Sequence, residues 1–330
     1  MDIFELLDKL AVIPGPSGRE QAVSAVIAEL AHPYVDEIST DSLGNLIAHK
    51  RGSGPRLMLA AHMDTIGLVA TYIEESGMVR VDQLGSIQPT EIRSSVVRFE
   101  NGTLGTVKVD GSADEKELSM RDLYLDIGAA TREEALRLVQ LGDTAVFTVK
   151  PQLVGQRIMG SGLDNRISCV ILLKAMEELK NSTADLYFTF TVQEEVGNRG
   201  AKTAAFNILP DYAVVVEATE VLDWPGVKKI TNAVLGGGAA IKVMDKSIIC
   251  HPSVVAKLTE LAEAGEIEYQ KQVTGVPGTD AGAIHQSCSG VKTGVISVPC
   301  RYHHTPTEII QLSDAEACVR LTVSIAGCKL

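Results

Sequence analysis

The sequence predicts an α/β layer fold whose main body is interrupted by a small β-rich domain. Two observations support this prediction. Helical and strand patterns alternate over residues 1–66 and again over 152–330, as in proteins that cover a sheet with helices. Residues 67–151 instead show a run of hairpin-like strand patterns. At 330 residues the chain is long enough for one large domain or two.

The first segment predicts two helices and three strands. Helical periodicity covers residues 2–12 and 19–31, with a rigid turn at Pro14-Gly-Pro-Ser-Gly18 between them. Ser17 is expected to cap the second helix, and Glu20, three residues on, completes a capping-box pattern. Short strands are expected at 35–39 and 45–50. A buried strand at 56–61 then runs directly into His62.

The middle segment predicts hairpins. Ser76-Gly77 separates two strand-like runs, and Asn101-Gly102, the strongest short hairpin signal, separates two more. One helix, at 132–141, precedes a strand at 145–149. We interpret residues 67–151 as a β-rich domain inserted into the larger one.

The third segment returns to α/β alternation. Helices are expected from Asp164 to about residue 179, at 253–264 and at 314–326, and strands at 185–192, 212–216 and 292–297. Gly236-Gly-Gly238 is interpreted as a tight structural turn. It lacks the phosphate-loop pattern, so nucleotide binding is not expected.

Composition excludes several classes of protein. The chain is 45% hydrophobic and 22% charged, as in ordinary soluble globular proteins. Its net charge of −12 and the lack of a Lys/Arg cluster argue against nucleic acid as a partner. No signal peptide and no apolar run of the ~20 residues that span a bilayer are found, so we expect a cytoplasmic protein without a membrane partner. The six cysteines are scattered, which favours reduced and mostly buried thiols.

Two adjacent carboxylates, Glu194 and Glu195, end the apolar strand at 185–192. Successive side chains at a strand end point in opposite directions. One carboxylate could therefore bind a metal while the other faces a substrate and moves protons. An isolated Glu-Glu pair is more often simply solvated, so other residues must decide.

His62 and Asp64 follow another buried strand. Residues two apart share a face of a strand, so Asp64 can accept the proton of the imidazole nitrogen that is not used for a metal. Asp164 lies in a glycine-bearing loop that leads into a helix. It could cap that helix or bridge two cations through its two oxygens.

Glu217 ends the apolar strand at 212–216 in the way that Glu194 ends its own. His303 and His304 lie between a strand and a proline-bounded loop. A surface acid and surface histidines are the ordinary alternatives for these positions.

Taken together, these residues follow successive buried strands, and ligands of open α/β sheets bind at the carboxyl ends of strands. Two imidazoles and three carboxylates suit a pair of Zn²⁺ or similar ions with open positions for water and substrate. The expected ligands are His62, Asp164, Glu195, Glu217 and one of His303 and His304.

Five motifs carry a resemblance that runs through nearly the whole chain. They are Ala61-His-Met-Asp64, Leu163-Asp-Asn-Arg166, Val192-Gln-Glu-Glu-Val-Gly197, Pro277-Gly-Thr-Asp-Ala-Gly-Ala-Ile-His285 and Arg301-Tyr-His-His-Thr-Pro306. With these motifs the sequence resembles the dinuclear zinc aminopeptidases of the tetrahedral-particle type, which include glutamyl and deblocking aminopeptidases.

The resemblance implies a role for each matching residue. It implies that His62 binds one metal, that Asp164 bridges both, that Glu195 binds the second, and that Glu194 is the general base. His304 matches the last ligand, and His303 stands where the family often has an aliphatic residue. Asp64 matches the partner of the first histidine, and Asp280 is expected to organise a nearby loop. The Asp164–Asn165 peptide is expected to be cis, as in related enzymes. Glu217 stands where the family usually has aspartate.

The resemblance also implies an architecture. Residues 1–66 and 152–330 would form a three-layer, zinc-exopeptidase-like catalytic domain with a mixed central sheet. Residues 67–151 would form a PDZ-like or barrel-like insert, which in relatives drives dimerisation. Such dimers build a hollow twelve-subunit particle that admits peptides. The insert is shorter around 110–120 than in many relatives.

The expected function is removal of the amino-terminal residue from peptides, with two divalent ions, zinc first and cobalt or manganese as alternatives. A carboxypeptidase or an N-acyl amino-acid deacylase could use the same site. A third hypothesis is a non-catalytic assembly protein. The presence of Glu194 and of a complete set of candidate ligands argues against it.

Overall fold

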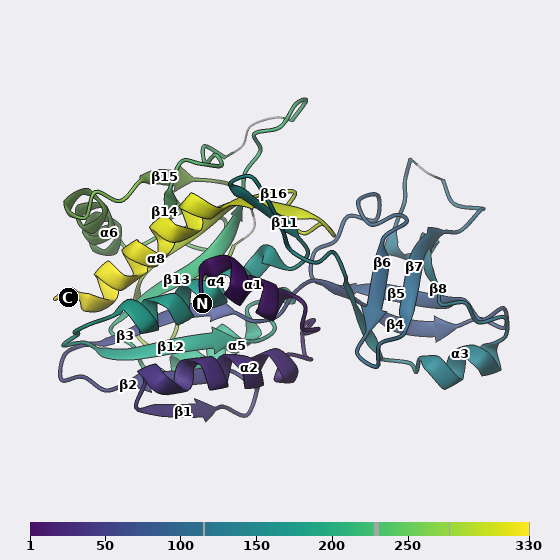
Figure 1. Ribbon diagram of the computed structural model, residues 1–330, viewed down its shortest axis with the longest axis horizontal. Coiled ribbons are helices and arrows are strands. Elements are labelled where there is room, and N and C mark those ends of the chain that lie inside the picture. Colours follow the sequence, from purple (N-terminus) through teal and green to yellow (C-terminus); the bar gives the residue numbers. More distant parts are fainter. Residues whose placement is uncertain (115, 228–230, 277, 330) are drawn as a thin grey trace.

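The computed structural model describes residues 1–114, 116–227, 231–276 and 278–329. It consists of a large α/β body and a smaller β-barrel beside it (Figure 1). Both chain ends lie in the large body.

One large mixed sheet forms the middle of the α/β body. Its centre is β12 (Asp185–Thr191), β3 (Arg56–His62), β13 (Tyr212–Glu220) and β16 (Lys292–Arg301), which pair in parallel. Thr191 lies opposite His62, so the carboxyl ends of these two strands are level. The outer strands are β1 (Glu37–Thr40), β2 (Leu46–Lys50), β17 (Glu308–Gln311), β11 (Arg157–Gly160) and β10 (Gln152–Val154). In addition, β14 (Ala239–Met244) pairs with β16, and β15 (Tyr269–Val273) pairs with β14.

Helices cover both faces of this sheet. One face carries α1 (Ile3–Ala11), α2 (Gln21–Ala31), α4 (Leu163–Glu178), α6 (Pro252–Ala264) and α8 (Leu312–Gly327); α5 (Arg199–Ile208) and α7 (Ala281–Ile284) contact the other. Two short 3-10 helices complete the list, η1 (His32–Tyr34) and η2 (Met120–Asp122). The predicted three-layer fold with a mixed central sheet is confirmed.

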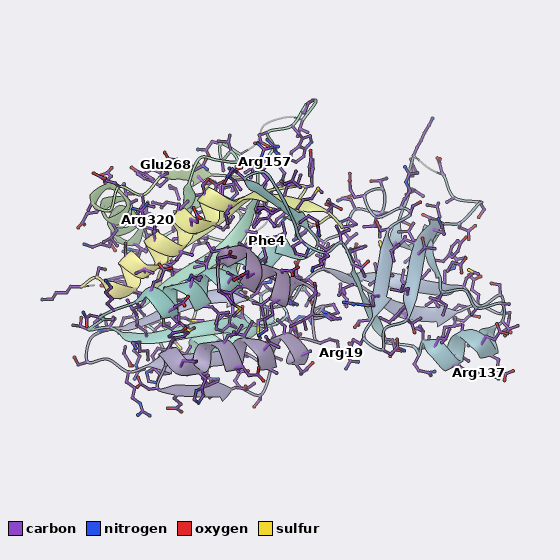
Figure 2. The ribbon with its side chains drawn as sticks, viewed as in Figure 1. Phe4, Arg19, Arg137, Arg157, Glu268 and Arg320 are labelled. Carbon is purple, nitrogen blue, oxygen red and sulfur yellow. The ribbon has the colours of Figure 1, made fainter. Side chains whose placement is uncertain are left out.

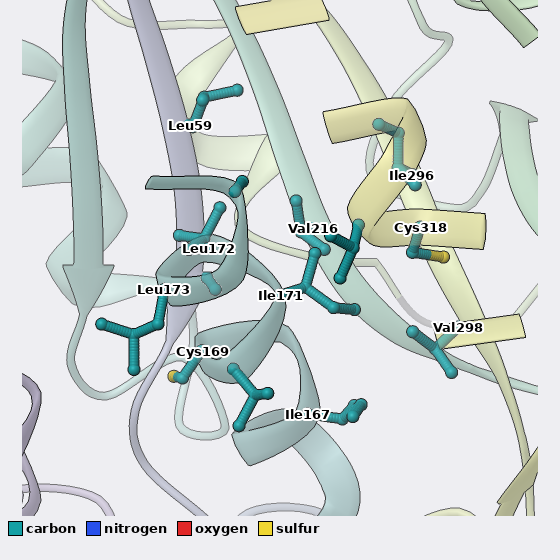
Figure 3. Close-up of a cluster of buried hydrophobic side chains, with 14 of the residues drawn as sticks. Leu59, Ile167, Cys169, Ile171, Leu172, Leu173, Val216, Ile296, Val298 and Cys318 are labelled. Carbon is teal, nitrogen blue, oxygen red and sulfur yellow. The ribbon is translucent and has the colours of Figure 1, made fainter. Parts of the chain in front are cut away.

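Helix α4 is buried between the sheet and its neighbouring helices. Ile167 and Ile171 face Val216 and Val298 of the sheet and Cys318 of α8 (Figure 3). Residues 163–173 of α4 are all buried, as expected for a helix whose apolar residues occur on several sides. The packing fixes the start of α4, where Asp164 lies.

The smaller body is a closed barrel of six antiparallel strands with its own apolar core. The strands, in the order in which they pair, are β4 (Gly67–Ile73), β5 (Val79–Leu84), β8 (Leu123–Asp126), β7 (Leu104–Val109), β6 (Val96–Phe99) and β9 (Thr144–Phe147). Helix α3 (Arg132–Leu138) lies at its outer end, where Arg137 is labelled in Figure 2. The insert is therefore barrel-like, and its boundaries at 67 and 151 stay a prediction.

Several sequence predictions differ from the structure. Ser17 does not cap α2, because that helix begins at Gln21 and Glu20, at the N-cap, makes no side-chain capping bond. The helix expected at 132–141 ends at Leu138. Helices α5 and α7 and strands β8, β10, β11, β14, β15 and β17 were not predicted.

Gly236 to Gly238 form a structural turn, as expected. The amides of Gly236 and Gly238 donate to the Asp314 carboxylate at 2.8 and 2.9 Å. All six cysteines are free and most are buried, as expected, with Cys288 as the exposed exception. In the described part of the chain, no helix has the length and apolar character needed to cross a bilayer.

Candidate metal centre

His62 is the last residue of β3, and its ring is fixed by the chain that follows. Nδ1 lies 3.1 Å from the backbone oxygen of Asp64 and 3.5 Å from its Oδ1. The carbonyl is thus the nearer acceptor, although the sequence predicted the carboxylate. When Nδ1 donates its proton there, Nε2 presents a lone pair to the cavity beyond.

The Asp64 carboxylate holds the turn that carries Glu194 and Glu195. It accepts hydrogen bonds from Ser17 Oγ at 2.7 Å, from Glu194 N at 3.0 Å and from Glu195 N at 3.2 Å. Burial alone would raise the pKa of Asp64, but His62 and these donors outweigh burial and lower the pKa. Asp64 is therefore a buried charge that positions both glutamates.

Glu194 and Glu195 lie beyond strand β12, which ends at Thr191. Gln193 has a φ of 54°, so strand alternation does not set the directions of the two carboxylates, contrary to the prediction. The side chains nevertheless diverge. Glu195 Oε2 lies 3.1 Å from His304 Nε2, whereas Glu194 faces the other side of the site.

Glu194 is held from behind by Asn198 and Asp280. Asn198 Nδ2 donates to Glu194 Oε1 at 2.7 Å and lies 3.4 Å from Asp280 Oδ1. Thr191 Oγ1 donates to the other oxygen of Asp280. Burial raises the pKa of Asp280 to about 6. Asp280 thus organises this side of the site, as expected from the sequence.

Asp164 lies beside His62 and His304. It does not cap α4, since Gly162 is the N-cap and Asp164 itself has non-helical angles, with φ −78° and ψ 111°. Its peptide bond to Asn165 is cis, as expected. Oδ1 lies 3.4 Å from His62 Nε2, and Oδ2 lies 3.2 Å from His304 Nε2. The two carboxylate oxygens therefore face two different histidines.

Glu217 is positioned by Asn165. The Asn165 side-chain amide donates to Val216 O at 3.2 Å and accepts from Ala218 N at 3.1 Å. It is thus hydrogen-bonded to the backbone on both sides of Glu217. Glu217 is buried, and its Oε1 lies 3.1 Å from His62 Nε2. The glutamate that departs from the family pattern thus reaches the site.

His304 lies in the turn after β16, with a φ of 60°. Its Nδ1 lies 3.0 Å from the backbone oxygen of Ser86, which belongs to the barrel. A carbonyl only accepts hydrogen bonds, so Nδ1 carries the proton and Nε2 presents its lone pair to Asp164 and Glu195. The neighbouring His303 also reaches Asp164 Oδ2, at 2.8 Å.

Glu308 is a site residue that the sequence did not reveal. Its carboxylate accepts from Asp164 N at 3.0 Å and from His304 N at 3.2 Å, which ties the two backbones together. Burial and the charge of Asp164 raise the pKa of Glu308 well above its usual range. In the sequence, the local sign of such a role was the position of Glu308 itself, an acid directly before the apolar pair Ile309-Ile310.

These side chains surround a cavity of about 250 Å³. It is lined by His62, Asp164, Glu194, Glu217, His303 and His304, together with Ser86 and Gln88 of the barrel and Thr219, Glu220, Lys242, Val276 and Thr279 of the α/β body. Every ligand and base expected from the sequence thus lies in this cavity or, for Glu195, in contact with His304 beside it.

The donor atoms fit bound cations. Asp164 Oδ1, Glu217 Oε2 and both carboxylate oxygens of Glu195 are buried without a hydrogen-bond donor. Buried polar atoms normally have partners, so this cluster of bare oxygens calls for cations. The distances agree, because a tetrahedral ion with donors at about 2.0–2.2 Å would hold those donors roughly 3.4 Å apart.

The electrostatics point the same way. Burial raises the pKa of Glu217 to about 7 and that of Glu194 well above its usual range, and neighbouring carboxylates add to both shifts. Cations between the carboxylates would offset this mutual repulsion. Imidazole and carboxylate donors together suit zinc and similar divalent ions.

A family comparison decides the identity. The model of the M42 glutamyl aminopeptidase family matches residues 44–321, which include all the residues lining the cavity. The chain belongs to the M42 glutamyl aminopeptidase family. Membership makes this M42 protein a hydrolase of the aminopeptidase class that uses divalent metal, as the sequence predicted.

Individual relatives agree. The lysyl aminopeptidase of Pyrococcus furiosus is 32% identical over 339 residues, which is 98% of this chain and 96% of that one. The structure of aminopeptidase APDkam598 from Desulfurococcus kamchatkensis has a TM-score of 0.93 at 36% identity and covers 98% of this chain and 94% of that one. The TET1 peptidase of Pyrococcus horikoshii, which can assemble into a tetrahedron or a large octahedral shell, has a TM-score of 0.88 at 34% identity over 99% of both chains.

Proposed function

We propose that this M42 protein removes the amino-terminal residue from peptides at a centre of two divalent ions, zinc in the first place. The observation that supports it best is the position of Asp164, whose Oδ1 faces His62 and whose Oδ2 faces His304. His62, Glu217 and Asp164 Oδ1 would hold one ion. Glu195, His304 and Asp164 Oδ2 would hold the other.

Two such ions would lower the pKa of a water molecule and polarise the scissile carbonyl. The chain itself would supply the proton transfer. Glu194 Oε1 is fixed by Asn198, and Oε2 lies 3.9 Å from His62 Nε2, so the carboxylate faces the space between the donors. Glu194 would accept the proton of the attacking water and deliver it to the leaving nitrogen, a role worth about 10² to 10⁴ in rate.

The cavity suits an exopeptidase. Its volume of about 250 Å³ lies below the range typical of pockets that hold larger ligands. A cavity of this size favours a small group such as one terminal residue.

We further propose that residues 67–151 mediate dimerisation and that dimers assemble into a closed particle, by analogy with the TET1 peptidase. The barrel carries exposed apolar side chains, among them Tyr72, Val96, Leu104 and Leu141. Ser86 of the inserted segment orients the ring of His304. Assembly that fixes the position of the barrel would therefore also fix the position of His304. Multi-angle light scattering tests this: a mass of one subunit would contradict the proposal.

Chromogenic aminoacyl substrates, assayed on metal-free protein with Zn²⁺, Co²⁺ or Mn²⁺ added back, test the function. Matched peptides blocked at either terminus separate the alternatives. We expect cleavage of peptides with a free amino terminus and none after amino-terminal acetylation. Preferential loss of activity on carboxyl-terminal amidation would instead show a carboxypeptidase, and release of acyl groups a deacylase.

A further inference from the structure

His303 makes a contact that the proposed centre does not yet use. Its Nε2 lies 2.8 Å from Asp164 Oδ2, closer than His304 Nε2 at 3.2 Å. The two imidazoles stack, with ring centroids 4.2 Å apart and planes inclined by 21°. Asp164 Oδ2 therefore meets two imidazoles, whereas Oδ1 meets only His62 among the described residues.

Apart from Asp164, no polar group in the described residues competes with a cation for the Nε2 atom of His303. Within the described residues its one polar contact is with Asp164, and its side chain is 20% exposed. No backbone carbonyl there fixes its tautomer, in contrast to His304 and Ser86. His303 also lines the cavity, and the donor atoms of Asp164, His303 and His304 all lie within 4.8 Å of one another, close enough to share one ion.

On this geometry we propose that His303 is a further ligand of the ion held by Glu195 and His304. The inference rests on the proposed two-ion function. That position would then have two imidazoles and two carboxylates, while the position of His62 and Glu217 would have one imidazole and two carboxylates. Zinc sites can expand from four ligands to five. Two ligand atoms that each lie about 2.1 Å from the ion, at a right angle to one another, are roughly 3 Å apart. The 2.8 Å between His303 Nε2 and Asp164 Oδ2 is close to that separation.

The extra imidazole has a chemical consequence. Nitrogen donors favour Co²⁺, Ni²⁺ and Zn²⁺ over Mn²⁺ and Mg²⁺. The Glu195 position would therefore bind zinc more tightly than the Glu217 position and would retain its ion longer against a chelator. The two halves of the centre would thus be chemically unequal in this protein.

Two substitutions distinguish ligation from a hydrogen bond. His303→Leu removes every polar function, whereas His303→Gln keeps an N–H that can donate to Asp164 but is a poor zinc ligand. Metal-free protein is titrated with Zn²⁺ against a chromophoric chelator, and bound metal is counted by mass spectrometry. His32→Gln, at an exposed histidine outside the cavity, is the control.

We expect wild type and His32→Gln to bind two ions with unequal affinity. Both His303 variants should bind the tighter ion at least about tenfold more weakly. Unchanged constants in His303→Leu, or wild-type constants restored by His303→Gln, would overturn the role of His303 and leave the two-ion centre intact. Fewer than two ions on the wild-type protein would overturn the centre itself and this inference with it.

Discussion

Replacing Asp64 with asparagine tests how the turn of Glu194 and Glu195 is held. The substitution keeps the size of the side chain but removes its charge and one acceptor. Asp64 accepts from Ser17 Oγ, which can rotate and accept instead, and from two backbone amides, which cannot. Whichever way the new amide lies, one of the Glu194 and Glu195 amides faces an NH₂ group.

The expected magnitude follows from these contacts. A lost hydrogen bond to a charged group costs about 1.5–3 kcal/mol, and the remaining bond weakens when the acceptor becomes neutral. We therefore expect Asp64→Asn to lower the free energy of unfolding by about 2–4 kcal/mol. The turnover number should fall as well, because the turn that positions Glu194 loses one of its two backbone anchors.

The free energy of unfolding is measured by urea unfolding, monitored by far-ultraviolet circular dichroism. Aminopeptidase kinetics are measured on the same samples. Ser17→Ala is the matched control, since it removes one donor and leaves the charge and both backbone bonds in place. It should cost less than Asp64→Asn on both measures. A wild-type midpoint and wild-type turnover for Asp64→Asn would refute this account of the turn.

Three further predictions concern other parts of the molecule. Glu194→Gln should keep two bound ions while turnover falls by about 10² to 10⁴, and substantial remaining activity would contradict the general-base role. The Asp314 carboxyl has a pKa raised from 3.8 to about 6 by burial, so its charge costs folding free energy above pH 6 and this cost disappears as the pH falls to about 4. Wild type should thus gain stability relative to Asp314→Asn between pH 6 and pH 4, and a constant difference in urea midpoint would contradict the assignment. Iodoacetamide should label the exposed Cys288 before the buried Cys169, whose pKa burial raises to about 12, as peptide mass spectrometry after short exposure can check.

The sequence predicted the site well where a residue follows a buried strand. His62 ends β3, as predicted, whereas Glu217 lies inside the neighbouring parallel strand β13, three residues before its end at Glu220, so the predicted strand end was wrong there. The two side chains nevertheless meet, near the carboxyl ends where ligands of such sheets bind. The proposed bridging role of Asp164 came from the family resemblance, because the residue pattern alone favoured a helix cap.

The errors arise where distant contacts override a local pattern. Ser17 and Glu20 form a capping-box pattern, yet Ser17 donates to Asp64, 47 residues away, and Glu20 accepts from Gln193, 173 residues away. No local periodicity contains those partners. The burial of Glu20, which raises its pKa, is a consequence of the same folding.

The positioning residues were the hardest to predict. Ser86 reaches His304 from the barrel across 218 residues of sequence, through a backbone oxygen that any residue would supply. Glu308 acts through its contacts with two backbone amides, Asp164 N and His304 N, which converge only in the folded chain. Such roles depend on tertiary geometry, which composition and spacing do not contain.

Anomalous diffraction from a crystal grown with Zn²⁺, recorded on both sides of the zinc absorption edge, tests the central claim most directly. The account predicts two anomalous peaks flanking Asp164, one against His62 and Glu217 and the other against Glu195 and His304. A single peak, or two peaks that do not share Asp164, would contradict it.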